Sequence, residues 1–160
     1  MIEMMRVARD LGTPADWLVR AKHDRCLADD EGTRLWAATT NGTPLGEISF
    51  TMGGREKQKA RVVRQQLWAQ RVLIGDGRKG QIEATCIVAR EVDAPAGVKP
   101  VEWRLLTNRA ANTLEQATQL IDWYRVRWEI EVYFNVLKTG CEIEKLQLAT
   151  VERVQKALAL

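Results

Sequence analysis

The glycine-rich stretch GDGRKG, residues 75–80, decides the fold of the first two thirds of the chain. It separates two extended segments, residues 62–74 and residues 82–90. One side of the second segment is apolar throughout and is formed by Ile82, Ala84, Cys86 and Val88. A period of two is typical of a strand with one buried face, and glycines beside an aspartate are typical of a turn. The stretch therefore predicts a β-hairpin.

Shorter segments on both sides of the hairpin also predict strands. Residues 17–23 place apolar side chains on one face and two basic side chains, Arg20 and Lys22, on the other. Residues 47–52 alternate strictly between polar and apolar and end at two glycines. Residues 101–107 give a further strand after a loop that contains two prolines. The first two thirds of the chain are therefore predicted to be rich in β-structure.

The last third of the chain is predicted to be helical. Residues 114–138 contain neither glycine nor proline. Asn112 or Thr113 can act as the N-cap, with a glutamate or a glutamine three residues later, as in a capping box. Gly140 ends or kinks this helix, and a second helix is expected at residues 150–160.

Four side chains of the long helix form a chemically coherent set. Tyr124, Glu131 and Lys138 are seven residues apart. They lie in one row, because seven residues at about 100° each return to within roughly 20° of the same direction. Arg127 lies beside this row. The buried stripe of the helix is expected on another face, formed by Trp123, Ile130, Phe134 and Leu137.

This set of four has two interpretations. A carboxylate flanked by two cations and a phenol suits a phosphodiester, because the carboxylate can hold a divalent metal while the cations hold the phosphate oxygens. The alternative is a solvated helix face on which Arg127 and Glu131 form an ordinary surface ion pair.

The composition excludes several other classes. The 160 residues, 46% hydrophobic and 28% charged, are typical of a globular protein, and no apolar stretch is long enough to span a membrane. The three cysteines are far apart and form no Cys-x-x-Cys, which excludes a zinc knuckle or a disulfide framework. The single histidine, His23, excludes a multi-histidine metal site.

The charge is concentrated in one segment. Residues 55–81 hold eight basic and two acidic residues and carry +6, whereas the whole chain carries +3. Such a segment predicts either a surface that faces phosphates or a solvated strand face with its loops.

The segment YRVRWEIEVYFNVLKTG, residues 124–140, resembles the tyrosine-arginine-glutamate-lysine signature of bacterial DDE transposases of the insertion-sequence-4 group. The best-known relative in that group is the transposon-five transposase. The resemblance also covers residues 17–25, the strand EWRLLT at 102–107 and the run 120–122, and it spans roughly residues 2–150. It implies DNA transposition, a recombination reaction with metal-dependent strand cleavage and transfer.

The resemblance implies a role for each matching residue. Glu131 matches the last acid of the catalytic triad and would be a ligand of Mg²⁺ or Mn²⁺. The residues that match side chains gripping transposon-end DNA near the cleaved phosphate are Tyr124, Arg127 and Lys138. Trp103 matches a tryptophan that holds a flipped base, with a strand tryptophan packed in the core as an equal alternative. Arg20 and Lys22 match basic strand residues close to DNA.

The resemblance also implies the fold class. It is α+β, a fragment of an RNase H-like catalytic domain with a mostly antiparallel β insertion followed by a long catalytic helix. Residues 1–12 would be the end of a core helix, residues 13–108 the β-rich insertion with one core strand, and residues 112–160 the C-terminal helices.

Two of the family's three catalytic acids have no match in this sequence. Two-metal phosphoryl transfer needs several carboxylates to hold ions about 3.5–4 Å apart, and Glu131 alone cannot do this. We therefore expect a truncated chain that does not cleave DNA by itself, binds the metal ion weakly and lacks the family's dimerisation region. Its expected partners are transposon-end DNA and a full-length transposase, in the bacterial cytoplasm at the nucleoid and away from membranes.

Two alternatives to this hypothesis remain open. One is a DNA-binding β module without catalysis, whose affinity for DNA would fall as the salt concentration rises. The other is an inactive structural leftover, with unpaired sheet edges and a partly uncovered helix.

Overall fold

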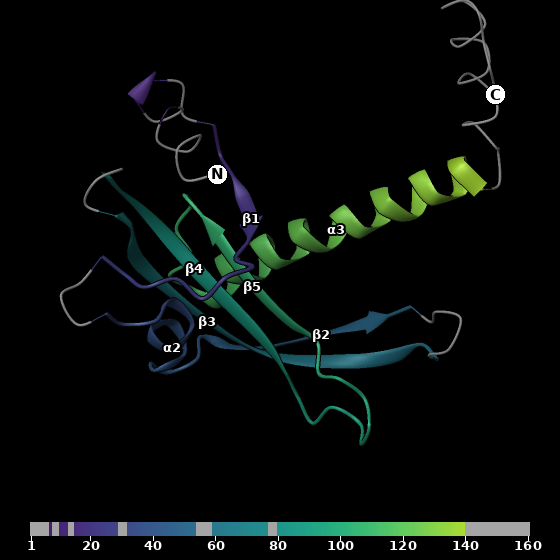
Figure 1. Ribbon diagram of the computed structural model, residues 1–160. Coiled ribbons are helices and arrows are strands. Elements are labelled where there is room, and N and C mark those ends of the chain that lie inside the picture. Colours follow the sequence, from purple (N-terminus) through teal and green to yellow (C-terminus); the bar gives the residue numbers. More distant parts are fainter. Residues whose placement is uncertain are drawn as a thin grey trace, which may run out of the picture. The chain divides into compact units, whose positions relative to one another are not determined.

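The computed structural model describes residues 7, 10–12, 15–28, 32–53, 59–76 and 80–139. The chain divides into two compact units, Met1–Ile121 and Asp122–Leu160. Figure 1 shows the elements in chain order, which are β1 (Leu18–Arg20), α2 (Leu35–Thr40), β2 (Gly46–Met52), β3 (Arg61–Asp76), β4 (Gly80–Val92), β5 (Glu102–Thr107) and α3 (Leu114–Thr139).

The five strands form one antiparallel sheet in the order β1-β5-β4-β3-β2. The predicted hairpin is confirmed, because β3 and β4 pair continuously from Arg64 opposite Val92 to Asp76 opposite Gly80. The strands predicted at 47–52 and 101–107 are also confirmed, as β2 and β5. β1 is shorter than predicted and covers only three residues.

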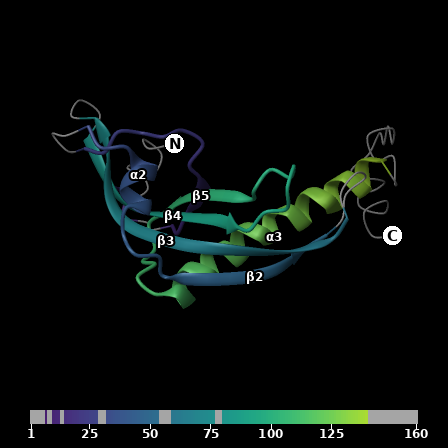
Figure 2. The ribbon, with the colours of Figure 1, turned by 90° about the horizontal axis from the view of Figure 1, so that it is seen from below.

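The sheet buries side chains on both of its faces. On one face, here called the α2 face, Leu35 of α2 packs in a core with Trp68, Val72, Ile74, Ile82, Ala84, Cys86, Val88 and Leu106. This confirms the apolar side predicted for β4, and burial there raises the pKa of the Cys86 thiol to about 11. Figure 2 shows α2 on one side of the curved sheet.

The opposite face of the sheet is buried as well. The residues that alternate with those of the α2 face point to it. They include Leu67, Ile87, Ala89 and Leu105. Gly46 pairs with Leu67, and a Cβ atom on Gly46 would lie 2.7 Å from Cδ2 of Leu114. The first turn of α3 therefore packs against this opposite face.

The sequence did not predict α2. This helix has only six residues and no side-chain cap from the residue before it, Arg34. Its first N–H groups are satisfied from a distance instead: the Trp36 N–H donates to the Asp24 carboxylate (3.0 Å), and the Leu35 N–H donates to the Arg25 carbonyl (2.9 Å). Caps that come from ten or more residues away leave no local sequence signal.

The predicted start of α3 is confirmed. The Thr113 hydroxyl accepts a hydrogen bond from the Gln116 N–H (3.2 Å), and the Gln116 side chain accepts one from the Asn112 N–H (2.9 Å). This reciprocal pair is a capping box. The helix runs to Thr139, so the predicted length is confirmed, while the helix predicted at 150–160 lies outside the described residues.

The predicted buried stripe of α3 is wrong. Trp123, Ile130 and Phe134 are 46%, 52% and 54% exposed. Among the helix side chains whose burial is described, Ala117, Leu120, Ile121 and Tyr124 are buried. These buried residues are spaced by three or four positions and therefore share one side of the helix, which differs from the predicted side. Glu131 lies on the same side, seven residues after Tyr124. None of the helices that the structure describes combines the length and the apolar character needed to cross a membrane.

A buried ion pair ties β3 to β4 near the end of the ladder. The Glu91 side chain is only 2% exposed and receives two hydrogen bonds from the Arg61 guanidinium. The Val101 N–H also donates to the Glu91 carboxylate, at 2.7 Å. The hydrogen bonds from Arg61 lower the pKa of the Glu91 carboxyl below its usual value near 4.5, and they outweigh the opposing effect of burial.

The Glu91 pair predicts a loss of stability in acid. Because the folded carboxyl has the lower pKa, its contribution is complete above about pH 4.5 and is lost as the pH falls through the folded value. In urea unfolding between about pH 7 and about pH 3, the stability difference between the wild type and Glu91→Gln should shrink. Glu83→Gln, which removes an exposed partner of Arg71, is the control and should cost little at any pH. Parallel pH profiles for wild type and Glu91→Gln would contradict the prediction.

The hairpin also depends on one glycine. Gly75 has a φ of +137°, and a Cβ atom there would lie 2.3 Å from the Gly80 carbonyl oxygen. Both the backbone conformation and the close approach of the partner strand therefore require glycine.

Gly75→Ala should lower the free energy of unfolding by about 2 kcal/mol or more, because the substitution adds backbone strain and a clash between strands. The control is Gly42→Ala, where a Cβ atom meets nothing within 4 Å and the change should be small. Chemical denaturation of the two variants tests this, and equal stabilities would refute it.

Candidate functional site

The candidate site on α3 is built around Arg127. Its guanidinium forms a salt bridge with the Glu131 carboxylate, one turn further along the helix. Its central carbon also lies 5.3 Å from the centre of the Tyr124 ring. The side chains of Arg127 and Glu131 are 46% and 49% exposed, whereas Tyr124 is 5% exposed. A cation is thus held between a fixed aromatic ring and a solvent-accessible carboxylate.

The Arg127 guanidinium is of a kind that recognises anions. Burial lowers the pKa of the Arg127 guanidinium, but hydrogen bonds to Tyr124 and Glu131 outweigh this effect and raise it above its usual value. The guanidinium is therefore always charged. Its planar set of N–H donors matches the oxygens of an anion such as phosphate.

Lys138 lies in the last turn of the same helix, and its side chain is exposed. Because α3 is uninterrupted from Leu114 to Thr139, the seven-residue spacing of Tyr124, Glu131 and Lys138 holds them in one row, as predicted. Their roles in binding and catalysis stay predictions.

The residues in this region do not by themselves fit a divalent metal ion. Mg²⁺ prefers near-octahedral oxygen coordination, and a two-metal site needs several carboxylates. Within the part of the chain that the structure describes, no three His, Cys, Asp or Glu side chains lie close enough together to hold a metal. Glu131 is therefore a possible ligand whose companions the described residues do not supply.

Trp103 lies in β5 as a packed strand residue. Its ring stacks on Phe50 of β2, with centroids 5.3 Å apart and an angle of 20° between the planes. The side chain is partly buried. The ring thus takes part in the sheet's own packing, and a base could stack only on the area that Phe50 leaves uncovered.

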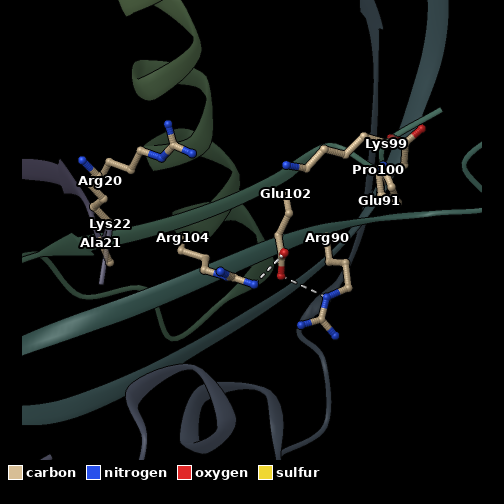
Figure 3. A pocket seen from close by; sticks show the side chains of 9 residues that line it. All are labelled: Arg20, Ala21, Lys22, Arg90, Glu91, Lys99, Pro100, Glu102 and Arg104. Atoms are coloured by element: carbon tan, nitrogen blue, oxygen red, sulfur yellow. Dashed lines mark hydrogen bonds and ion pairs between the residues drawn. The ribbon is translucent and has the colours of Figure 1, made fainter. Parts of the chain in front are cut away.

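Arg20 is the last residue of β1, at one edge of the sheet, and Lys22 follows two residues later. Arg20 pairs with Leu105 of β5, and both basic residues line a hollow together with residues of β4 and β5. Figure 3 shows the Arg20 side chain apart from the acidic and basic side chains gathered around Glu102.

Much of the predicted basic segment is neutralised by the sheet. Arg61 pairs with Glu91, Arg64 with Asp93 and Glu47, and Arg71 with Glu83. All four acids lie outside residues 55–81, and antiparallel pairing brings them beside the arginines. The described strand therefore carries less net charge than the segment taken alone.

The sequence did not single out a second charged cluster, in β4 and β5. Glu102 accepts hydrogen bonds from Arg90 (3.1 Å) and from Arg104 (2.7 Å). Arg104 also lies 3.7 Å above the ring of Trp36, and Arg90 lies 5.7 Å from that of Trp68. These residues are scattered over the sequence, so only the register of the strands reveals the cluster.

Comparison with known protein families matches residues 13–160 to the transposase DDE domain. The match covers most of the chain, including β1 to β5, α3 and all the candidate residues named above. This chain belongs to the transposase DDE domain family. The resemblance inferred from the tyrosine-arginine-glutamate-lysine signature is confirmed at this level.

Membership in the family gives the broad chemistry of the chain. Transposases of this kind act on DNA and generally use divalent metal ions. The five-stranded antiparallel sheet followed by a long helix agrees with the predicted antiparallel β region and helix.

Proposed function

We propose that this chain works in DNA transposition, with α3 as the element that binds the phosphodiester. The observation that carries this proposal is the position of Arg127 between Tyr124 and Glu131 on an exposed part of the helix. The family match supplies DNA as the substrate. In this proposal Arg127, Tyr124 and Lys138 hold the phosphate region of a transposon end.

The proposal also assigns Glu131 as the last acid of a DDE site in an RNase H-like domain of the insertion-sequence-4 group. The ion pair with Arg127 holds the carboxylate next to a phosphate-binding cation. A Mg²⁺ or Mn²⁺ ion would stabilise charge on the reacting phosphate, and Glu131 would be one of its ligands. Trp103, Arg20 and Lys22 would contact the same DNA.

A narrower function is favoured by one observation. Among the described residues, no three His, Cys, Asp or Glu side chains lie close enough together to hold a metal ion. The described part of α3 offers Glu131 beside several cations, a set that can bind DNA without cleaving it. We therefore propose DNA binding as the activity of this chain alone, and strand cleavage only where further carboxylates complete the site.

Arg127→Ala should weaken binding to duplex DNA about tenfold, because it removes a charge-assisted contact to phosphate. The slope of log K against log salt should become shallower by about one. Fluorescence anisotropy at several salt concentrations measures both quantities. Loss of the exposed pair with Glu131 should cost the fold only about 0.5 kcal/mol, so the variant stays folded.

The matched control is Arg125→Ala. Arg125 is two residues away on the same helix and pairs with Asp122, so its removal changes the net charge equally. Its effect on DNA binding should be clearly smaller. The proposal fails if the wild type binds no DNA at low salt, or if the two variants weaken binding to the same extent.

The chain alone should show no strand cleavage of duplex DNA with Mg²⁺ or Mn²⁺, because one carboxylate cannot hold two metal ions. Gel analysis of labelled duplexes and supercoiled plasmid checks this. Turnover that disappears in Glu131→Ala would overturn the narrower proposal and would show that the chain supplies a full set of ligands.

A further inference from the structure

A basic hollow of about 360 Å³ lies within the first unit, Met1–Ile121. Its wall is made by the chain after β1, by β4 and β5 and by the loop that joins these two strands. The lining residues that matter here are Lys22, Arg90, Glu91, Lys99, Glu102 and Arg104. Figure 3 shows the side chain of Lys99 extending toward the space above Glu102 and Arg104.

The hollow carries an excess of positive charge. Five basic side chains line it, against two acids. Glu91 is already occupied by Arg61 and by the Val101 N–H. Glu102 is shared between two arginines. Lys22 and Lys99 form no ion pair with any residue that the structure describes.

Two guanidiniums of the hollow are held in place before any ligand arrives. Arg104 stacks on Trp36 at 3.7 Å, and Arg90 lies over Trp68 at 5.7 Å. Glu102 accepts a hydrogen bond from each arginine and so links the two guanidiniums. Such fixed guanidiniums lose little freedom when they bind an anion.

Arg104 has a donor left over. Its Nε atom is buried and has no hydrogen-bond partner among the residues described. A buried polar group without a partner is costly, so an anion that enters far enough to accept this hydrogen bond would remove that cost. Arg90 donates to Glu102 through Nε, which leaves its terminal nitrogens available for the same ligand.

We propose that this hollow binds one phosphate group, held by Arg104, Arg90 and Lys99. Planar guanidiniums match the tetrahedral phosphate oxygens, and a lysine adds a mobile point charge. The volume is at the small end of the range for ligand sites, roughly 300–1,000 Å³, and the charged wall does not suit an apolar molecule. Resting on the proposed function, the phosphate belongs to a DNA strand, and a free phosphate is the other possible source.

The first experiment titrates the full chain with inorganic phosphate and follows the arginine Nε–H signals by NMR. Arg104→Lys identifies the Arg104 signal by deleting it. That signal should shift and saturate, and Lys99→Ala should weaken phosphate binding about tenfold through the loss of one charge-assisted contact. Lys99 is an exposed loop residue, so this variant should keep its fold.

The matched control is Lys59→Ala, an exposed lysine outside the hollow that changes the net charge equally. It should leave phosphate affinity unchanged. The proposal is overturned if phosphate leaves the Arg104 signal unmoved, if chloride at the same ionic strength shifts it equally, or if both lysine variants behave alike.

The second experiment separates a DNA phosphate from a free one. If the phosphate is part of DNA, Lys99→Ala should reduce DNA affinity and make the salt slope shallower by about one, whereas Lys59→Ala should not. If Arg127→Ala weakens DNA binding and Lys99→Ala does not, the proposed function survives and the assignment of this hollow to DNA is overturned. If phosphate binds but DNA does not, the proposed function fails and the source is a free phosphate.

Discussion

The antiparallel ladder between β3 and β4 is the interaction on which the rest of the structure depends. It fixes which side chains share a face of the sheet, so it sets both the core beneath α2 and the opposite face that receives the start of α3. β2 and β5 attach to its two sides, and β1 attaches in turn to β5. The ladder closes where Gly75 lets the two backbones approach closely. Its register also brings together the ion pairs between the two strands, such as Arg61 with Glu91 and Arg71 with Glu83.

The same register changes the meaning of the charge distribution. Taken along the chain, residues 55–81 form the basic part, but cross-strand pairing places acids from elsewhere beside Arg61, Arg64 and Arg71. A second concentration of positive charge lies around Arg90 and Arg104, where two tryptophan rings lie beneath the guanidiniums and Glu102 pairs with both. Ion pairs between exposed side chains contribute little to the free energy of folding. These pairs therefore matter mainly because they determine the distribution of charge on the surface.

The long helix α3 has a packed part and an exposed part. Its first turns bury small and aliphatic side chains, whereas the part after Tyr124 exposes apolar rings next to Arg127 and Glu131. A buried tyrosine beside an exposed arginine gives a support for a cation. The family match implies DNA as the substrate, and the proposed role of Arg127 is consistent with it.

The sequence by itself determined the hairpin, β2, β5 and α3 with its capping box, because each depends on local periodicity and on residues a few positions apart. It also determined the row of Tyr124, Glu131 and Lys138, since helical spacing is enough to place them. Only the tertiary structure decided the rest. α2 is capped by Asp24 from twelve residues away, the buried line of α3 differs from the predicted stripe, and the hollow around Arg104 joins distant segments. Burial and charge pairing between distant residues follow from strand register, which no local pattern encodes.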